Sequence, residues 1–392
     1  MKPRYCLLIL FVSIIFLNQR IYAVIIKVPD HFQSIQEAIE HAKNSDTILV
    51  ANGTYHENLN IKNKDIVLAS NFLYSQDKDD IRKTIIDGNG GLFGIKVINT
   101  TSKTCIFGFT IENAEDGVSV RSKISFFHNV VKNCGDGLDY ESKSGGICRN
   151  NTLELNNDDG VDLDNDVDII IERNIIKNNG DDGIEIRLQP YSGKMVKNDI
   201  RNNFIINSGE DGIQLIDYPD SSHRFISIKN NIISNSAKAA IGCMNNGNTR
   251  ENYEAAEMVE RVLIINNTIL KNTYGICGGG NSIVLNNVLS NTQYTALKGI
   301  RGNSVVAFQN LYLNGINYTD CNLIKNTITF NDPKLKENFD LMNDSPLIGR
   351  GTTTYTYKDK VYGIDTNVKQ KSVNIGALNT GISGWMKNIG PF

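Results

Sequence analysis

A five-residue phrase recurs along the chain from about residue 105 and constrains the fold more than any other feature. It consists of Asn, two apolar residues, a variable residue and a second Asn, as in NVVKN (129–133), and two copies are one residue longer. The common spacing of 20–23 residues is typical of one coil of a solenoid, and wider gaps indicate inserted loops. The copies begin at Asn129, Asn151, Asn174, Asn203, Asn231, Asn267, Asn287 and Asn310.

A second phrase follows, in which an acidic residue and Gly precede alternating apolar residues. Each coil therefore contains short strands separated by Asn or Asp-Gly turns, whose residues tolerate the left-handed backbone conformation. Stacked Asn side chains can hydrogen-bond from coil to coil, and no helical period runs through 105–330. We predict an all-β fold, a single-stranded right-handed parallel β-helix (a solenoid). The clearest copies are EDGVSV (115–120), GDGLDY (135–140), DDGVDL (158–163), DDGIEI (181–186) and EDGIQL (210–215).

The open end of a solenoid needs a cap, because its unpaired strand edge would otherwise bind other chains. Residues 34–43, SIQEAIEHAK, have the pattern of an amphipathic helix whose first turn is capped by Ser34 and Glu37. Strands are expected to follow within 47–61. The predicted apolar stripe of the cap helix consists of Ile35, Ala38, Ile39 and Ala42.

The N-terminal residues predict export. Lys2 and Arg4 precede an apolar run over 6–17, and a cleavage site is plausible after Ala23. The run is shorter than the roughly 20 residues that span a membrane, although an uncleaved anchor is the alternative. We expect a signal peptide over 1–23, a cap over 24–61, the β-helix over 62–330 and a closing segment over 331–392, in a secreted or periplasmic protein.

The charge of the chain argues against two classes of partner. Removing 1–23 takes away Lys2, Arg4 and Arg20, which changes the formal charge from −3 to −6. A mildly acidic protein has no general attraction for nucleic acid or for anionic membranes, so we expect no nucleic-acid partner. No later apolar run approaches the length of a membrane span, so we expect none after cleavage. We also expect a monomer. Six widely spaced cysteines would remain. Disulfides are possible after export, but buried unpaired thiols are our interpretation.

Two passages resemble a known group of proteins. The passage SIQEAIEHAKNSDTILVANGTYHENLNI (34–61) resembles the N-terminal cap of the pectin-lyase-like superfamily, which includes pectate lyases, pectin methylesterases and polygalacturonases. Residues 331–351 and 373–378 resemble the closing segment of bacterial right-handed β-helix repeat proteins. The resemblance implies the architecture, but a fold does not by itself give a function.

Aligning the coils on the Gly of the second phrase predicts columns of side chains on the surface. Parallel strands lie about 4.8 Å apart, so carboxylates at equivalent positions would crowd together. The residues just before the Gly are Asp116, Asp136, Asp159, Asp182 and Asp211. The residues two positions after it are Ser119, Asp139, Asp162, Glu185, Gln214, Gly242, Cys277 and Lys298.

Crowded carboxylates must share a proton or a cation, and Ca²⁺ binds several oxygen ligands. The phrase DDGVD (158–162) resembles the D-D-G-W-D calcium motif of family 9 pectate lyases. Carried across, this resemblance implies a Ca²⁺ site at Asp136, Asp158, Asp159 and Asp162. The phrase DDGIE (181–185) is a second copy, with Asp181, Asp182 and Glu185.

The resemblance also implies a base. In that family a Lys further along removes the C5 proton of a uronate, and β-elimination follows. We compare the position two residues before the Gly of the second phrase, where the two copies have Asp158 and Asp181. Two coils beyond the first copy this position holds Glu210, and two coils beyond the second copy it holds Lys238. Lys238 or Arg187 is therefore the candidate catalytic residue. Val161 and Ile184 stand where the family motif has an aromatic residue.

Three functions remain open from the sequence. The first is a Ca²⁺-assisted lyase acting on an acidic, uronate-containing polysaccharide. The second is a non-catalytic surface or polysaccharide-binding β-helix in which Asp residues cap their own turns through Asx hydrogen bonds and form a structural ladder. The third is a glycoside hydrolase, which needs two suitably spaced carboxylates. Longer segments at 187–199, 216–225 and 245–261 could wall a polymer cleft.

Overall fold

The computed structural model describes residues 23–218, 222–253, 256–322, 329–363 and 372–377. The predicted signal peptide therefore lies outside the described residues except for Ala23, as do parts of the predicted closing segment. Among the described residues, no helix is both long enough and apolar enough to cross a membrane.

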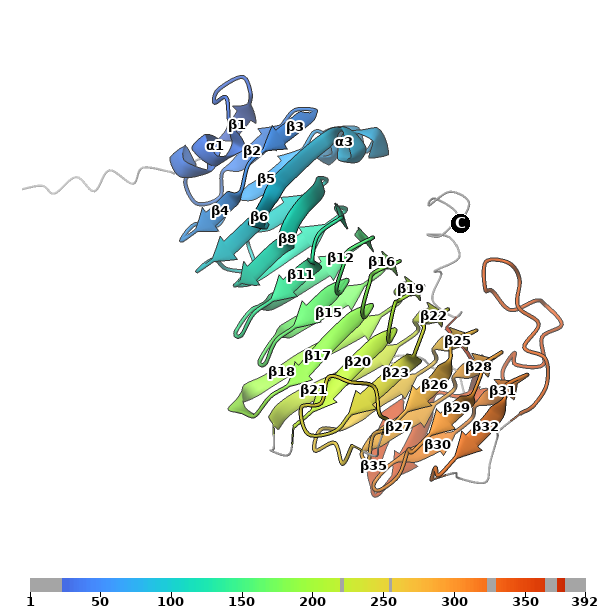
Figure 1. Cartoon of the computed structure of the whole chain (residues 1–392). Coiled ribbons are helices and arrows are strands. Elements are labelled where there is room, and N and C mark those ends of the chain that lie inside the picture. The colour runs from blue at the N-terminus through green and yellow to red at the C-terminus, as the bar shows by residue number, and fades with distance from the viewer. Residues whose placement is uncertain (1–22, 219–221, 254–255, 323–328, 364–371, 378–392) are drawn as a thin grey trace, which may run out of the picture.

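The chain winds into a parallel β-helix in which each coil contributes one strand to each of three parallel ladders (Figure 1). This confirms the predicted fold. The first ladder is a 12-stranded sheet. Its strands are β1 (Ile25–Val28), β2 (Thr47–Val50), β5 (Val67–Ser70), β7 (Cys105–Phe107), β9 (Lys123–Phe127), β12 (Gly145–Arg149), β15 (Asp168–Glu172), β18 (Tyr191–Arg201), β21 (Ser222–Lys229), β24 (Val262–Ile265), β27 (Ser282–Leu285) and β30 (Val305–Ala307).

The second and third ladders are joined near the N-terminus by two long strands that run through both, β6 (Thr84–Ile98) and β8 (Thr110–Arg121). Two short strands, β3 (Gly53–His56) and β4 (Leu59–Lys62), pair with β6. The second ladder continues through β10 (Val130–Lys132), β13 (Thr152–Glu154), β16 (Ile175–Lys177), β19 (Phe204–Ile206), β22 (Ile232–Ser234), β25 (Thr268–Leu270), β28 (Val288–Ser290) and β31 (Asn310–Tyr312). The third continues through β11 (Asp136–Tyr140), β14 (Val161–Leu163), β17 (Ile184–Leu188), β20 (Ile213–Asp217), β23 (Ala239–Met244), β26 (Tyr274–Cys277), β29 (Thr295–Lys298) and β32 (Ile316–Thr319).

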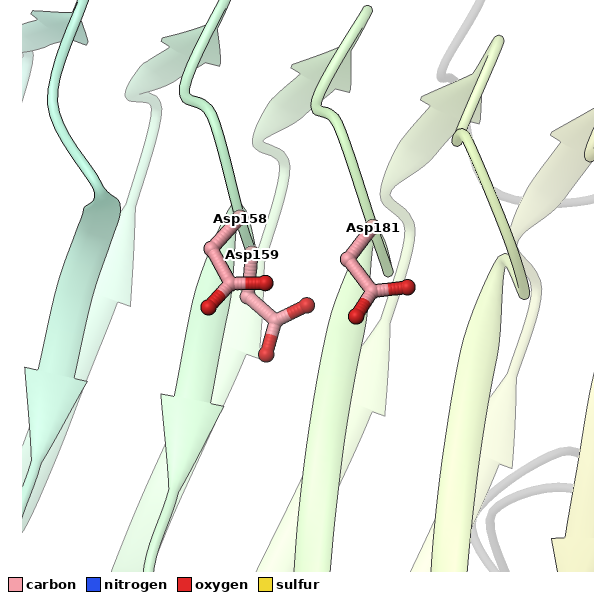
Figure 2. Close-up of side chains that lie close together, drawn as sticks. All are labelled: Asp158, Asp159 and Asp181. Carbon is pink, nitrogen blue, oxygen red and sulfur yellow. The ribbon is translucent and has the colours of Figure 1, made fainter. Parts of the chain in front are cut away.

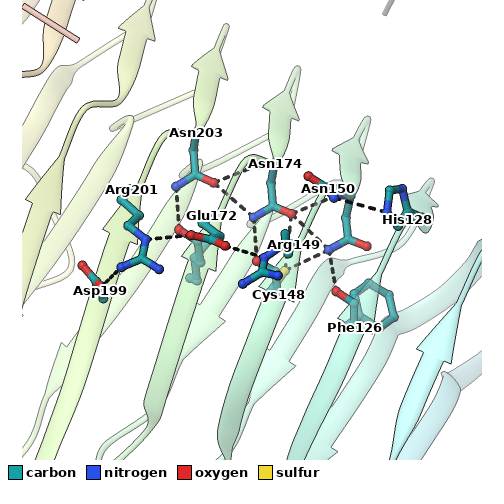
Figure 3. A network of polar contacts seen from close by, with 12 residues as sticks. Phe126, His128, Cys148, Arg149, Asn150, Glu172, Asn174, Asp199, Arg201 and Asn203 are labelled. Carbon is teal, nitrogen blue, oxygen red and sulfur yellow. Dashed lines mark hydrogen bonds and ion pairs between the residues drawn. The ribbon is translucent and has the colours of Figure 1, made fainter. Parts of the chain in front are cut away.

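An Asn ladder stabilises the corner between the first and second ladders. Each Asn accepts a hydrogen bond from the backbone N–H of its equivalent one coil earlier, as Asn203 Oδ1 does from Asn174 at 3.0 Å. Its side-chain amide donates back to an earlier carbonyl, as Asn203 does to Ile171 at 2.8 Å. Figure 3 shows this ladder beside ion pairs of Glu172 with Arg149 and Arg201 on the outward face of the first ladder. The buried backbone groups of this corner are therefore satisfied by side chains.

The predicted ladder is confirmed from Asn129 to Asn287, but the prediction for its last member is wrong. Asn287 donates its backbone N–H to Gln309 Oε1, not to Asn310. Asn310 pairs with Val288, one position further along the strand. Gln309 is fully buried, and its longer side chain still reaches the carbonyl of Val284 at 2.9 Å. Matching the phrase therefore predicted the register of the coil at 310 wrongly by one residue.

The N-terminal cap is a helix, as predicted. Helix α1 spans Ile35–His41, and Ser34 Oγ accepts the backbone N–H of Glu37 at 3.1 Å. The four residues of the predicted apolar stripe are all buried. Glu57, which precedes β4, accepts the backbone N–H groups of Ile35 and Gln36 at 2.9 and 2.8 Å. The cap is thus held to the first coil by its own N-terminal donors.

We expect Ser34→Ala to lower the free energy of unfolding by about 1 kcal/mol, because it removes one acceptor from the first turn of α1. Chemical denaturation followed by circular dichroism measures the change. Asp30→Ala is the control, since Asp30 is exposed and lies just before the helix. Equal losses in both variants would show that the Ser34 hydrogen bond contributes nothing specific.

Two short helices interrupt the predicted β-helix region. Helices α2 (Phe72–Ser75) and α3 (Lys78–Lys83) lie between β5 and β6, and the sequence pattern did not predict them. They form one wall of a cavity of about 980 Å³ over the outward face of the second ladder. Residues of that face which line the cavity are Thr110, Val130, Lys132, Thr152, Glu154, Ile175 and Lys177.

The described part of the C-terminal segment packs against the outward faces of the β-helix. Strand β33 (Gly351–Thr352) pairs with β36 (Ser372–Val373), and β34 (Thr354–Tyr357) forms a hairpin with β35 (Lys360–Gly363). Leu347 and Ile375 cluster with Leu270 and Val288 of the second ladder. Three Tyr side chains from the hairpin cover the first ladder: Tyr355, Tyr357 and Tyr362.

The cysteines behave as buried apolar residues. All six cysteines of the described residues are free thiols, and the interpretation as buried residues holds for four of them. Four are buried, namely Cys134, Cys148, Cys243 and Cys277, and two are partly buried, namely Cys105 and Cys321.

Candidate functional site

The acidic residues gather at the corner between the second and third ladders and on the adjoining outward face of the third. Strand pairing confirms the predicted column: Asp139 is opposite Asp162, Asp162 opposite Glu185, and Glu185 opposite Gln214. The column then continues through Gly242, Cys277 and Lys298. Counting residues from the Gly of the second phrase, the DG phrase, therefore gave the correct register at these coils.

The Asp residues just before each Gly form a ladder of their own. Asp136, Asp159 and Asp182 each accept, through Oδ1, the backbone N–H of the equivalent Asp one coil later, at 3.0, 2.8 and 2.6 Å. Asp211 accepts the N–H of Ala239 at 2.7 Å. These bonds run between coils and not within one turn, so the expected Asx turn is replaced by a carboxylate equivalent of the Asn ladder.

Unlike Asn, an ionised Asp cannot donate a second hydrogen bond, so its other oxygen is left for a proton or a cation. Among the described residues, Asp182 Oδ2 is buried without a hydrogen-bond partner, and Asp182 is only 1% exposed. Asp162 Oδ1 is also buried without a hydrogen-bond partner. The ladder therefore holds the coils together, and at Asp182 it leaves a buried oxygen without a hydrogen-bond partner among the described residues.

The carboxylates form three overlapping clusters, in each of which one oxygen from every member lies within 4.8 Å of the others. One consists of Asp159, Asp162 and Glu185. A second consists of Asp158, Asp159 and Asp181, whose side chains project from neighbouring coils at the same corner (Figure 2). The third consists of Asp181, Asp182 and Glu251.

The clusters divide the ligand set that the resemblance implied. Asp158 and Asp162 share no cluster among the described residues, although each is clustered with Asp159. Asp136 lies one coil earlier and uses one oxygen in the Asp ladder. Glu251 was not predicted, because it lies in the inserted segment after β23, outside the repeat.

Burial and mutual repulsion raise the pKa values of these carboxyl groups. Burial, followed by the charge of Asp116, raises the pKa of Asp139 to about 7. Burial raises the pKa of Asp136 to about 6. Burial, followed by the charge of Glu185, raises the pKa of Asp162 to about 9. Burial also raises the pKa of Glu185 to about 7, and Arg187 opposes both shifts. The predicted crowding is therefore present and unfavourable for several full negative charges.

Arg187 lies among the strand carboxylates. Its guanidinium contacts Glu185 Oε1 at 2.5 Å, Asp164 Oδ1 at 3.6 Å and Asp162 Oδ1 at 3.9 Å. These contacts raise its own pKa. Arg187 thus projects into the same region as Asp162 and Glu185, where it offsets part of their charge.

Lys238 lies further along the corner, beside the third cluster. Its Nζ contacts Glu251 Oε2 at 3.0 Å and Glu210 Oε1 at 3.8 Å. A hydrogen bond to Glu251 raises the pKa of the Lys238 amine. An ammonium group paired in this way must release its own proton before it can act as a base, and these contacts oppose that release.

A row of three tyrosine rings lies beyond Lys238 and runs from the buried Tyr253 to the exposed Tyr294. Tyr253 and Tyr274 have ring centroids 5.3 Å apart, and Tyr274 and Tyr294 are 5.4 Å apart. Lys298 Nζ lies 5.2 Å from the ring of Tyr274. Tyr294, at the end of the row, is 52% exposed, so its ring offers a flat surface to solvent.

Comparisons with known proteins agree with the fold. Residues 48–220 and 93–257 match the family described as a right handed beta helix region. The fold is similar to that of pectate lyase Pel9A, with a TM-score of 0.60, 14% identity, and coverage of 91% of this chain and 96% of that chain. No curated protein sequence matches the chain.

Two further structures share the fold. One is the catalytic unit of the thermostable GH87 alpha-1,3-glucanase from Streptomyces thermodiastaticus, with a TM-score of 0.53, 14% identity, and coverage of 80% of this chain and 68% of that chain. The other is the Azotobacter vinelandii mannuronan C-5 epimerase AlgE4 A-module, with a TM-score of 0.51, 14% identity, and coverage of 73% and 87%. Since the matched segments together span more than half of the chain and the strands form the fold they describe, the chain belongs to the right-handed β-helix family.

Proposed function

We propose that this protein is a carbohydrate-active β-helix protein that cleaves an acidic, uronate-containing polysaccharide by Ca²⁺-assisted β-elimination. The observation that carries the proposal is the cluster of Asp159, Asp162 and Glu185 with Arg187 in contact. It combines a set of oxygen ligands for a cation with a neighbouring cationic side chain. The similarity in fold to a pectate lyase is in keeping with it.

The residues present suit Ca²⁺. Their donors are carboxylate oxygens, which this ion prefers, and Asp162 Oδ1 is buried without a hydrogen-bond partner among the described residues. Asp159, Asp162 and Glu185 would hold the ion, with Asp158 and Asp181 beside them. Bound there, Ca²⁺ would supply positive charge to the substrate carboxylate and make the C5 proton more acidic.

The chain offers two candidate side chains for removing the C5 proton. Arg187, which contacts three carboxylates, is one candidate, either to bind a uronate carboxylate or to act as the base. Lys238 is the other candidate base, and it would act after Glu251 and Glu210 are drawn away from its amine. Tyr294, the exposed ring at the end of the tyrosine row, offers a stacking surface for a sugar ring of a bound polymer.

Absorbance near 235 nm, where the unsaturated product absorbs, tests the proposal on a panel of acidic polysaccharides with Ca²⁺ or EDTA. We expect a rise that EDTA abolishes, and a loss of at least about 100-fold in rate for Arg187→Ala or Lys238→Ala, whichever is the base. Lys123→Ala, a pair partner of Asp168 on the first ladder, is the control and should keep full activity. Reducing sugar released without this absorbance, and without Ca²⁺, would instead indicate hydrolysis.

A second candidate is a non-catalytic, polysaccharide-binding β-helix, favoured by the inter-coil hydrogen bonds of the Asp ladder. In that case Ca²⁺ would raise the melting temperature, but no polysaccharide would give a 235 nm product. Export to the cell exterior or periplasm, and a monomeric state, remain part of the proposal. Mass spectrometry of the secreted protein and light scattering would test them.

A further inference from the structure

The segment after β23 returns over the third ladder and is anchored there by one ring. Tyr253 is 4% exposed, and its hydroxyl donates to Asp211 Oδ1 at 2.5 Å while accepting the N–H of Ala239 at 2.9 Å. Gly242 makes room for it, because a Cβ at that position would lie 2.8 Å from the ring and 2.0 Å from Asp211 Oδ2. The position of Tyr253 brings residues 245–253 next to the acidic corner.

Glu251 is the charged residue that this anchoring delivers to the corner. Its side chain is 5% exposed. Oε1 accepts a hydrogen bond from Gln214 at 3.2 Å, and Oε2 accepts one from Lys238 at 3.0 Å. Burying an acid at the side of an acidic ladder is costly unless a cation offsets the charge. Lys238 offsets one charge only.

Two aspartates complete the group. One oxygen from each of Asp181, Asp182 and Glu251 lies within 4.8 Å of the others. Asp182 is almost fully buried; its Oδ1 accepts the N–H of Asp211 at 2.6 Å, and its Oδ2 has no hydrogen-bond partner among the described residues. An unpartnered buried oxygen within a group of three carboxylates is the environment that a divalent cation satisfies.

We propose that Asp181, Asp182 and Glu251 form a second divalent-cation site, selective for oxygen-binding ions such as Ca²⁺, which fastens residues 245–253 to the β-helix. The site has no ligand in common with the cluster of Asp159, Asp162 and Glu185. Its role is to hold the segment as a fixed wall of the acidic corner, and it does not depend on the proposed lyase reaction.

Hydrogen exchange over residues 245–253, followed by mass spectrometry with CaCl₂ or EDTA, tests the proposal. In the full-length protein we expect Ca²⁺ at about ten times its dissociation constant to slow exchange of this segment roughly tenfold. Glu251→Gln and Asp182→Asn should each lose the slowing. Asp182→Asn retains an oxygen that can accept the Asp211 N–H, so the ladder is preserved.

Two further variants make the result decisive. Glu257→Gln removes an exposed acid close to the segment and should respond to Ca²⁺ as the wild type does. Asp162→Asn alters the proposed lyase site and should keep the slowing at 245–253 even if 235 nm activity is lost. Ca²⁺-dependent slowing that persists in Glu251→Gln, or no slowing in the wild type, would overturn the second site and leave the lyase proposal standing on its own assay.

Discussion

Asn203→Ala is expected to lower the free energy of unfolding by about 3–5 kcal/mol and the melting temperature by roughly 5–10 °C. Asn203 is fully buried, and its side chain bonds Asn174 N–H, Ile171 C=O and Asn231 Oδ1. Alanine leaves the backbone N–H of Asn174 buried without its acceptor and removes one donor from the carbonyl of Ile171. The expected loss of stability exceeds that of one hydrogen bond, because an unpaired buried group bears its full desolvation cost.

Thermal unfolding followed by circular dichroism measures the effect. Met195→Ala is the matched control: Met195 lies in the same coil, on β18, and is 66% exposed, so its loss should change stability by less than about 0.5 kcal/mol. If the two variants melted within a degree of each other, the Asn ladder would be a consequence of the fold and not a source of its stability.

The second large effect is a loss of stability as the pH rises. The pKa of Asp139 is raised to about 7 and that of Asp136 to about 6, chiefly by burial. An acid whose folded pKa lies above its unfolded value of about 4 keeps a proton that the unfolded chain has released, so its contribution is lost between those values. The melting temperature should therefore fall as the pH rises from 5 to 8, and Ca²⁺ should reverse part of the fall at pH 8.

Asp139→Asn tests the origin of this dependence without changing a proposed cation ligand. At pH 8 we expect it to stabilise the protein by about 1–2 kcal/mol, since it removes a charge that faces Asp116 and neighbouring carboxylates. At pH 5 the difference should nearly disappear. Asp30→Asn, at an exposed position, is the control. A pH profile that Asp139→Asn leaves unchanged would place the titrating groups elsewhere in the molecule.

The fold was predictable because the same five-residue phrase meets the same structural requirement in successive coils. A buried corner needs a side chain that both accepts and donates, and Asn at a spacing of 20–23 residues meets that need. In the coil after Asn287, Gln309 makes these hydrogen bonds, whereas the phrase match had selected the next residue, Asn310. The predicted register of that coil was therefore wrong by one residue. Sequence matching detects the residue type, whereas the ladder requires only the hydrogen-bonding groups.

The elements outside the repeat could not be predicted in this way. Helices α2 and α3 are short, and the contacts that place the C-terminal segment join residues far apart in sequence, as between Asn286 and Thr352. Nothing in the local pattern near 347 indicates packing against β28. These contacts follow from apolar outward faces that become apparent only when the coils are stacked.

The candidate site was partly predictable. Counting from the DG phrase placed Asp162 opposite Glu185, because strand register carries the count from coil to coil. It could not show that Asp159 bonds the next coil, since that depends on which way the carboxylate points. Glu251 was missed because its segment has no register with the repeat, and its position depends on Tyr253 reaching Asp211 across 42 residues of chain.

The three corners of the coil differ in how much variation in length they tolerate. The corner between the first and second ladders is two residues long in coils such as 173–174, and the next corner is fixed by its Asp and Asn side chains. Segments of very different length, from 189–190 to 245–261, connect the third ladder back to the first. The register of β18 shifts between Tyr191 and Val196, but from Val196 onward the first ladder pairs regularly. For protein engineering, this corner is the place to graft foreign peptides or new recognition loops, and lineages of such proteins can diversify there while keeping one scaffold.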